Sequence, residues 1–441
     1  MKTWKIIAVV VVGILILSMA ACTGGSTGGS SAPAATPPGS SASSSSGGSA
    51  SAEPALTGSI TFGTNRTDLA DNLLQDKANE FMAAHPGTTI TFEGIGNPEQ
   101  DLATRMASEE LPDITIVLKN ITPDKYADYF LPIDDLGFSP DTLLFYNKGV
   151  GSDGKLYTTT ETMSYFGICY NKSAFKAAGI DKIPTTKAEF FDVCQKLKAA
   201  GITPLATAFK DKWTLMYYSD EFEVPSSLVG DANYRSNLKN QDAILTDDGG
   251  TLASFQFMRD MADKGYLESD LFSANWDQLK KDFGSGKAAM FYAGTWFPPH
   301  MVNDNGSTWD DQGMFPFPDA KGTPLLSDWS HAIAKNTKSP ELAKAFYKYC
   351  FIDGKFAEWQ KFIPAIKGVP YDNPTVDEIL SYNLPILEFP APLDETVTNI
   401  FNQSQIDLEG ALQEYMTSKD PQSVVTKVND QWAKTKAEVV K

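Results

Sequence analysis

Short strand-like runs separated by amphipathic helical windows begin at Gly58 and continue through most of this chain. Residues 59–62 alternate polar and apolar side chains, and residues 68–84 then repeat apolar side chains at helical spacing until Pro86 and Gly87 interrupt the pattern. Residues 88–92 alternate again, and residues 114–118 form a further β-rich run. This β-α-β-(α)-β order predicts an α/β lobe.

A second set of strand-like and helical segments begins near residue 165. Residues 166–170 are predicted to form a strand, and Thr186 with Glu189 matches a capping box at the start of a helix that Gly201 ends. Further elements are predicted as a helix over 251–264, a strand over 288–292, a helix from Pro340, and two C-terminal helices broken at Pro421. The pattern therefore predicts an α/β protein of more than one lobe with a helical C-terminal end.

The N-terminus has the layout of a secretory signal peptide over residues 1–21. Lys2 and Lys5 precede an apolar run over 6–17, which is shorter than the roughly 20 residues that a membrane span needs. Residues 19–22 (Met-Ala-Ala-Cys) resemble a bacterial lipobox, with Met19 where Leu is usual. We therefore expect cleavage before Cys22, lipidation of Cys22, and attachment to the extracytoplasmic face of the cell membrane through the acyl chains only.

Residues 23–52 consist only of Ser, Gly, Ala, Thr and Pro, and they cannot bury a core. Together with Cys22 and the residues up to 57 they are predicted to form a flexible linker, whose end-to-end distance would be roughly 30 to 35 Å. The three other cysteines, Cys169, Cys194 and Cys350, lie in apolar patterns. We expect small buried thiols, with a Cys169–Cys194 disulfide as the alternative.

The charge balance and the scarcity of ligating residues narrow the possible functions. There are 37 basic and 55 acidic residues and no basic run beyond the first residues, so a nucleic-acid partner is not expected. Three histidines and four cysteines, none at metal-ligand spacing, give no reason to expect a metal or another cofactor. The sequence thus favours a binding protein over an enzyme.

Two motifs could suggest catalysis, and neither holds. Residues 284–287 (Gly-Ser-Gly-Lys) lack the upstream glycine and the following Ser or Thr of a phosphate loop, so a turn into a strand is predicted. Glu161 with Glu109 and Glu110 could supply a carboxylate pair for glycoside hydrolysis, but nothing in the sequence sets their separation. A polysaccharide hydrolase remains the enzymatic alternative.

The order of several segments resembles the extracellular solute-binding proteins of bacterial ABC importers, in particular the sugar-binding family that includes maltose-binding protein. The resemblance rests on residues 111–114 (Leu-Pro-Asp-Ile); 170–172 (Tyr-Asn-Lys) with Phe175 and Gly179; 184–186 (Pro-Thr-Thr) with Cys194, Leu197 and 201–204; 283–290 with 294–296; and 339–343 with Phe346. No single motif is specific, but their order extends over about 380 residues.

The resemblance implies two α/β lobes joined by crossing segments, with a ligand bound between them. We place the crossings near 162–167, 324–329 and 384–389. The N-terminal lobe would comprise 58–162 and 328–384, and the C-terminal lobe 167–324 and 389–441. The implied function is capture of a sugar or oligosaccharide by a monomer that closes on it and delivers it to the membrane permease. Closure requires a ligand that contacts both lobes, because only a ligand with higher affinity for the closed state can shift the equilibrium between open and closed lobes.

Polar residues that follow strands are candidate ligand contacts, because such contacts gather at strand ends in open α/β sheets. Asn65 and Arg66 follow the first strand, and Lys119 and Asn120 follow the strand over 114–118. Asp68 is the ambiguous neighbour, since it could instead cap the next helix. Asp328 lies at a predicted crossing and completes the polar candidates.

Three tryptophans are candidates for stacking on the apolar face of a sugar ring: Trp213, Trp296 and Trp329. Trp276, Trp359 and Trp432 lie in helical patterns and are predicted to be core residues. Two rival functions remain. Trp213, Trp296 and Trp329 could form an aromatic cage for a cationic or quaternary ammonium solute, or the fold could serve a sensor or adhesion lipoprotein without transport.

Overall fold

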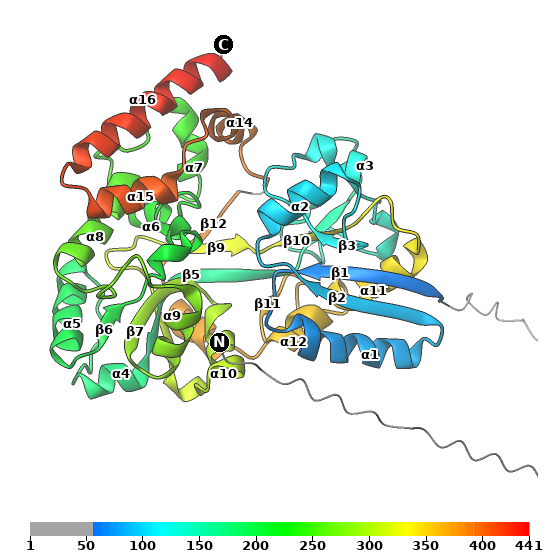
Figure 1. The fold of residues 1–441 in the computed structure, drawn as a ribbon, viewed down its shortest axis with the longest axis horizontal. Helices are drawn as coiled ribbons and strands as arrows, with labels where there is room; N and C mark the ends of the chain where they lie inside the picture. The colour runs from blue at the N-terminus through cyan, green and yellow to red at the C-terminus, as the bar shows by residue number, and fades with distance from the viewer. Residues whose placement is uncertain (1–55, 391, 441) are drawn as a thin grey trace, which may run out of the picture. The chain divides into compact units, whose positions relative to one another are not determined.

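The computed structural model describes residues 56–390 and 392–440, and these fold around two β-sheets (Figure 1). The predicted signal peptide, the lipidated Cys22 and the linker as far as residue 55 lie outside the described residues. The two sheets confirm the predicted α/β class, and helices form the C-terminal end as expected.

The first sheet has five strands in the order β2-β1-β3-β10-β4, with β1 parallel to β2 and β3, and β10 antiparallel to β3 and β4. Its strands are β1 (Gly58–Thr64), β2 (Thr88–Gly94), β3 (Ile114–Ile116), β4 (Thr158–Thr160) and β10 (Ser330–Ile333). Helix α1 (Gln75–Ala84) packs on β2, and α11 (Pro340–Phe351) packs on β1 and β10. Phe62 and Phe346 are buried in the core that these elements share.

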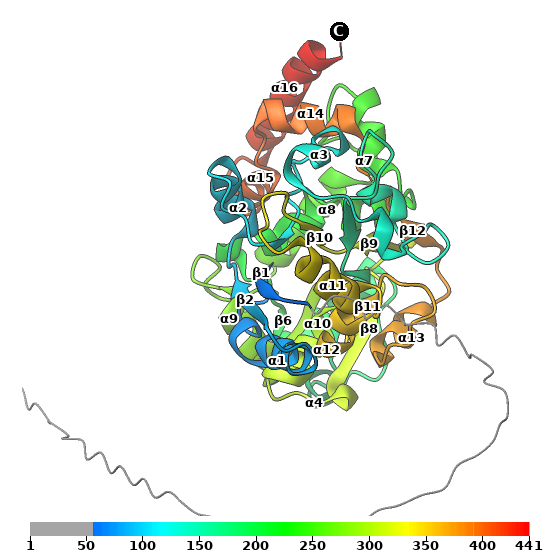
Figure 2. The same ribbon diagram turned by 90° about the vertical axis from the view of Figure 1, so that its right-hand side faces the viewer.

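The second sheet follows the order β12-β9-β5-β7-β6, and β8 and β11 also pair with β5. Its strands are β5 (Thr162–Asn171), β6 (Thr203–Leu205), β7 (Ala288–Gly294), β8 (Gln312–Phe315), β9 (Thr323–Ser327), β11 (Ile363–Pro364) and β12 (Ile386–Glu388). Strand β7 is buried along its whole length, which fits its continuous apolar sequence. The last helices, α14, α15 and α16, lie side by side and add Ile400, Leu412 and Trp432 to this core (Figures 1 and 2).

The remaining α-helices lie between these strands and at the C-terminal end. They are α2 (Pro98–Ala107), α3 (Tyr126–Tyr129), α4 (Lys172–Ala177), α5 (Lys187–Ala199), α6 (Glu223–Val229), α7 (Tyr234–Asn237), α8 (Thr251–Asp263), α9 (Trp276–Gly284), α10 (Phe297–Asp304), α12 (Lys355–Gln360), α13 (Pro374–Leu380), α14 (Glu395–Ser404), α15 (Leu408–Thr417) and α16 (Pro421–Val439). None of the described helices combines the length and apolarity that crossing a membrane requires.

Local sequence signals set several element boundaries as predicted. The capping box of Thr186 and Glu189 is present at the start of α5, and Gly201 follows that helix at a φ of 76°, which suits glycine. The helix predicted over 68–84 instead begins with a π-helical turn at Ala70–Leu74 before α1. No side chain caps that turn, whose N-cap residue is Leu69, and the carboxylate of the preceding Asp68 binds Arg66.

The chain passes between the two sheets through very short links. Glu161 alone separates β4 from β5, and Asp328 with Trp329 separates β9 from β10. The links bind each other: the Glu161 amide donates to the Trp329 carbonyl at 2.9 Å, and the Asp328 amide donates to the Thr162 carbonyl at 2.9 Å. The two links are therefore hydrogen-bonded neighbours between the sheets.

The third crossing lies earlier in the chain than the sequence indicated. Helix α13 packs on β8 and β5, and its Ile379 belongs to the core around the second sheet. Just before this helix, the side-chain Nδ2 of Asn373 donates to the Thr295 carbonyl at 2.7 Å. The chain has therefore returned to the second sheet before α13, whereas we predicted a crossing near 384–389. The apolar face of α13 packs on β8 and β5, which come together only in the folded sheet. The sequence of α13 alone therefore could not show which lobe the helix joins.

The described cysteines are free. Cys169, Cys194 and Cys350 are all buried and unpaired, so the buried-thiol prediction is confirmed and the alternative Cys169–Cys194 disulfide is absent. Two tryptophan predictions are also confirmed, because Trp359 packs in the first core and Trp432 in the second.

Candidate functional site

A cavity of about 1,450 Å³ is lined by residues from both sheets and from both links between them. Asn65 and Arg66 follow β1, Trp296 follows β7, and Glu161 and Asp328 are link residues. These side chains reach one cavity because the strands of each sheet end beside the crossings. The site therefore combines residues that are far apart in the sequence.

One part of the cavity is aromatic. The Trp213 ring centroid lies 5.1 Å from that of Trp276 and 6.5 Å from that of Trp296, and the latter two are 6.0 Å apart. Trp213 is 36% exposed, so part of its indole is available to a ligand. Gly294 makes room for this cluster, because a Cβ there would lie 2.6 Å from Cδ1 of Trp296. The three rings provide an apolar surface suited to a flat or ring-shaped ligand.

The backbone is strained next to these aromatic residues. Lys212 precedes Trp213 with a φ of 33°, and Ala208 and Phe222 have φ values of 46° and 63°. Residues with side chains rarely adopt such angles, which persist only where surrounding packing enforces them and which cluster at ligand sites. Packing therefore constrains the backbone of residues 208–222 beside the cavity.

Arg66 and Asp68 form a rigid pair beside the tryptophans. Arg66 donates through Nε and a terminal nitrogen to the two Asp68 oxygens, each at 2.9 Å, and through its other terminal nitrogen to Gln360 at 2.7 Å. Burial would raise the pKa of Asp68, but the hydrogen bonds and charge of Arg66 outweigh it and lower the pKa to about 2. Asp68 is therefore ionised at neutral pH.

His300 approaches this pair from the second sheet's side. Its Nδ1 lies 3.9 Å from Asp68, and its ring stacks on Phe362 with centroids 5.9 Å apart. Burial lowers the pKa of His300 well below its usual value, the charge of Arg66 adds to this, and Asp68 opposes it. His300 therefore meets Asp68 as a neutral ring that can exchange hydrogen bonds with a ligand.

A second contact across the cavity involves Lys119 and Glu221. Lys119 follows β3, and its ammonium group forms an ion pair with Glu221, which precedes α6. Burial would lower the pKa of Lys119, but the charge and hydrogen bond of Glu221 raise it above its usual value. The same ammonium lies 5.7 Å from the ring centre of Trp329. Trp329 packs against the apolar cluster around Leu118, and its ring makes no contact with the Trp213 cluster in the described structure.

Glu161 and His331 form a buried pair at the link between the sheets. His331 Nε2 lies 3.2 Å from the Gly63 carbonyl, which can only accept, so Nδ1 faces Glu161 Oε2 at 3.3 Å without a proton. Burial, and next the charge of Asp328, raises the pKa of Glu161 well above its usual value, while burial lowers that of His331 to about 3. Burial therefore favours the neutral form of both groups.

Lys148 supports the same link. Its ammonium donates to Ser327 Oγ at 2.8 Å and to the Asp328 carbonyl at 3.0 Å. Burial lowers the pKa of Lys148 to about 8, although Asp328 and other carboxylates oppose the shift. The lysine thus ties a loop of the first lobe to the second crossing.

Seven of the eight residues proposed from the sequence line this cavity: Asn65, Arg66, Lys119, Trp213, Trp296, Asp328 and Trp329. Asn120 does not line it; it is exposed in a turn after Lys119. Trp276, predicted to be a core residue, lines the cavity as well, because the Asn275 cap starts α9 with this side chain on the cavity side. Sequence reasoning also missed His300, Phe362, Glu221 and Glu223, for which no local signal exists. Glu109 and Glu110 are not near Glu161 in the cavity lining, so that carboxylate pair does not form there.

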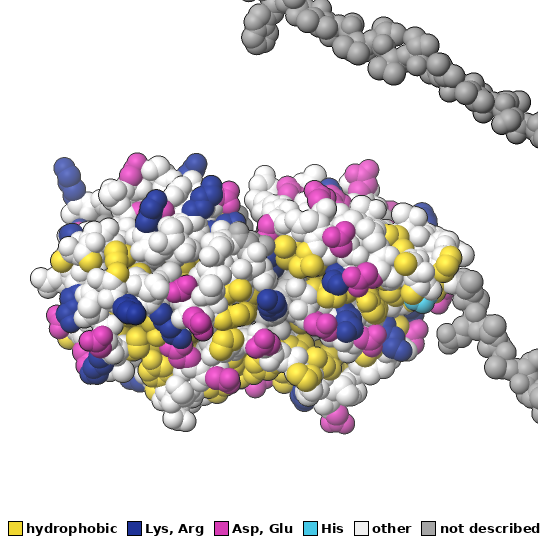
Figure 3. Space-filling view, turned by 90° about the horizontal axis from the view of Figure 1, so that it is seen from below, with side chains coloured by type: hydrophobic (Ala, Val, Ile, Leu, Met, Phe, Trp, Pro, Cys, Tyr) yellow, Lys and Arg dark blue, Asp and Glu magenta, His cyan; other side chains and the backbone are white. Residues whose placement is uncertain are grey.

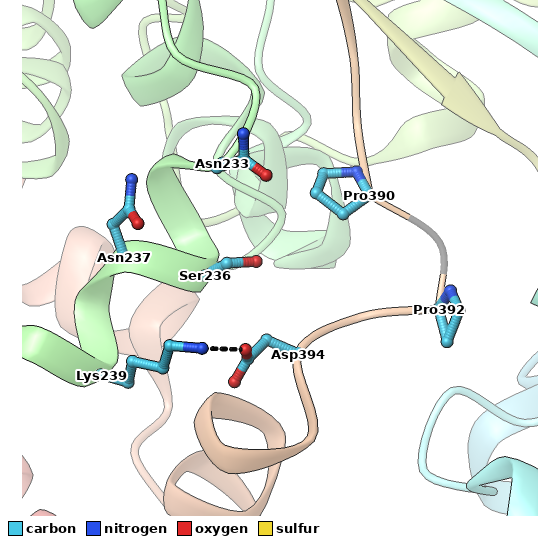
Figure 4. A pocket seen from close by; sticks show the side chains of 7 residues that line it. All are labelled: Asn233, Ser236, Asn237, Lys239, Pro390, Pro392 and Asp394. Carbon is cyan, nitrogen blue, oxygen red and sulfur yellow. Dashed lines mark hydrogen bonds and ion pairs between the residues drawn. The ribbon is translucent and has the colours of Figure 1, made fainter.

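A smaller pocket of about 420 Å³ adjoins the main cavity, and Ser236, Pro390 and Pro392 line both (Figure 4). Its wall is polar and includes the ion pair of Lys239 with Asp394 at 2.6 Å. On the face drawn in Figure 3, acidic and basic side chains are interspersed with apolar ones. That face shows no continuous basic stripe of the kind that nucleic-acid binding uses.

Comparison with known proteins identifies the family. The family described as bacterial extracellular solute-binding protein matches residues 66–351, which is more than half of the chain. This chain belongs to that family. The assignment confirms the resemblance seen in the sequence, and it is a family of solute-binding transport components rather than of enzymes.

Individual relatives support the same assignment. The multiple sugar-binding protein of Streptococcus mutans is 26% identical over 301 residues, which cover 65% of this chain and 69% of that protein. The sn-glycerol-3-phosphate-binding periplasmic protein of Brucella abortus is 28% identical over 160 residues, only 35% of its own length. The binding protein of an ABC transporter from Bifidobacterium animalis subsp. lactis, solved in complex with mannobiose, aligns with a TM-score of 0.74 at 21% identity and covers 87% of this chain and 95% of that one. The last comparison confirms the two-lobed fold.

Proposed function

We propose that this solute-binding protein captures an oligosaccharide in the cavity and delivers it to the permease of an ABC importer. The observation that carries the proposal is the cavity itself, in which a cluster of three tryptophans adjoins walls of hydrogen-bonding side chains. A sugar has an apolar ring face and a rim of hydroxyls, and the two kinds of wall match these two properties. At about 1,450 Å³ the cavity exceeds the roughly 300 to 1,000 Å³ of drug-sized sites, which favours several sugar units over one.

The relatives support a carbohydrate ligand. One is named a multiple sugar-binding protein, and a solved structure of the same fold holds mannobiose. A glycerol phosphate ligand, as in the name of the Brucella abortus relative, fits this cavity less well. Its lining holds more acidic than basic side chains, which would repel a phosphate.

The aromatic-cage rival is also disfavoured by the geometry. A cage needs the three proposed rings around one point, but Trp329 packs around Leu118 with Lys119 over its face. A second lysine, Lys280, lies 5.4 Å from the ring centre of Trp276. Because the protein's own cations already occupy these ring faces, a quaternary ammonium ion would have to displace them.

Closure of the lobes is the mechanism we propose. The lobes would be 58–160 with 330–366, and 162–327 with 374–440, and they would rotate about the links at Glu161 and Asp328–Trp329. A ligand that contacts the tryptophans of the second lobe and Arg66 or Asp68 of the first would favour the closed arrangement. Lipidation at Cys22 would hold the monomeric protein at the extracytoplasmic face of the membrane, where the linker predicted from the sequence would let it reach the permease.

A ligand screen tests this proposal. We expect a rise in melting temperature with at least one of manno-oligosaccharides, raffinose and N-acetylglucosamine oligomers, since a ligand at 100 times its Kd adds about 2.7 kcal/mol to folded-state stability. The ligand found should also reduce the radius of gyration in small-angle scattering. Stabilisation by glycerol 3-phosphate but by no carbohydrate would contradict the proposal, and an unchanged radius would contradict closure.

A further inference from the structure

Acidic side chains outnumber basic ones in the part of the cavity around Lys119, which we call the acidic end. Its cavity-lining acids are Glu99, Glu161, Glu221, Glu223, Asp328 and Glu409, and its basic residues are Lys119, Lys148 and Arg235. Six carboxyl groups therefore share this end of the cavity with three cations. Burial raises the pKa of five of them, and only the pKa of Glu221, which is paired with Lys119, is lowered, so this end lacks the positive charge that would hold all six ionised.

The three cations of the acidic end already have partners. Lys119 is paired with Glu221, and Lys148 donates to Ser327 Oγ and the Asp328 carbonyl. Arg235 donates to Thr398 Oγ1 at 3.4 Å, and its guanidinium lies 5.5 Å from the ring centre of Phe401. Among the described residues, none of these hydrogen bonds, ion pairs and ring contacts involves Glu223.

Glu223 is the acid whose surroundings point most clearly to a missing partner. It lines the cavity, is only 1% exposed, and its Oε2 has no hydrogen-bond partner among the described residues. Burial, followed by the charge of Glu221, raises its pKa well above the usual value. A buried carboxyl group without a partner costs free energy that a donor on the ligand would recover.

We infer that the oligosaccharide carries a protonated amine, and that this amino-sugar unit binds in the acidic end with its ammonium group on Glu223. The inference rests on the proposed function, because it specifies the sugar class of the same cavity. A neutral hydroxyl could donate to Glu223 Oε2, but it would not offset the cost of a buried carboxylate. An ammonium group donates to Oε2 and also stabilises the ionised form of Glu223, so the hydrogen bond becomes charge-assisted.

The rest of the cavity fits the same ligand. The cluster of Trp213, Trp276 and Trp296 offers an apolar surface for the ring face of another sugar unit. An oligomer of glucosamine presents both features, a ring face on one unit and an ammonium group on another. The N-acetylated oligomer has the same ring faces and linkage but lacks the charge, so it is the matched probe.

Titration calorimetry with two oligomer series decides the matter. Glucosamine dimers to tetramers should bind at least tenfold more tightly than N-acetylglucosamine oligomers of equal length at neutral pH, because a hydrogen bond to a charged group exceeds a neutral one by about that factor. In Glu223→Gln, binding of the glucosamine oligomers should weaken at least tenfold, and their advantage over the N-acetylated series should be lost. A urea unfolding curve of the same preparation shows whether the variant is folded.

Glu341→Gln is the matched control, because it removes the same charge from an exposed position on α11. It should leave both series unchanged. Equal or tighter binding of the acetylated series, or an unaltered preference in Glu223→Gln, overturns the inference. If manno-oligosaccharides or raffinose bind and glucosamine oligomers do not, the inference fails while the proposed function stands; if no carbohydrate binds, the proposed function itself fails.

Discussion

Replacement of Trp213 by Ala tests whether the tryptophan cluster binds the ligand. Trp213 begins a 3₁₀ helix over Trp213–Tyr218, follows the strained Lys212, and contacts the edge of Trp276. Its indole contacts Trp276 and Trp296, and all three side chains line the cavity. The variant therefore removes ligand-facing surface and only part of a packed cluster.

The expected loss of affinity follows from the exposed area. Trp213 is 36% exposed, which for a side chain of about 250 Å² leaves roughly 90 Å² of surface to be covered by a sugar ring. At about 25 cal/mol per Å² this contributes about 2 kcal/mol, or roughly thirtyfold in Kd. Loss of the contacts with two ring neighbours should cost about 1 to 3 kcal/mol of folding stability at most.

Titration calorimetry and a urea unfolding curve on the same preparations separate the two effects. The control is Trp359→Ala, because Trp359 is only 9% exposed in the first core. That variant should lose about 3 to 5 kcal/mol of stability and keep its affinity. If Trp213→Ala loses stability on that scale but binds its ligand as tightly as the native chain, the indole is a core residue and the stacking surface is not where we place it.

Other properties of the chain can be tested in the same way. Asp68→Asn should be about 1 to 2 kcal/mol less stable than the native protein near neutral pH. The pKa of Asp68 is lowered from 3.8 to about 2, which stabilises the native fold above pH 3.8, and this stabilisation is lost as the pH falls toward 2. Urea unfolding between pH 2 and 6 should show the stabilities of the two proteins converging at the acid end, and a constant difference would rule the linkage out. Glu221→Gln removes the ion pair with Lys119, so the ligand-free variant should have a larger radius of gyration in small-angle scattering; an unchanged radius means that this pair does not hold the two sides together. Cys22→Ala should appear in the medium or as unprocessed precursor in cell fractionation, and mature membrane-bound protein would argue against lipidation there.

The sequence by itself determined the elements and their order. The capping box of Thr186, the glycine at 201 and the apolar run of β7 each act over a few residues, so their effect does not depend on distant parts of the chain. Alternation of strand and helix patterns likewise indicated the α/β class, and polar residues after strands correctly indicated Asn65, Arg66 and Lys119 as cavity residues. The order of short motifs indicated the family. These signals are local, or they keep a fixed order along the chain.

Only the tertiary structure decided which side chains share the site. Trp213, Trp276 and Trp296 come from three separate segments and meet through packing around β7, and the helical pattern around Trp276 could not distinguish a core face from a cavity face. Trp329 lies in a crossing as expected, yet it packs against the apolar cluster around Leu118, which follows strand β3 of the first sheet. The pairing of Glu161 with His331 joins residues 170 positions apart through β4 and β10. Burial, and with it the protonation of such groups, depends on contacts between distant segments, which no local pattern contains.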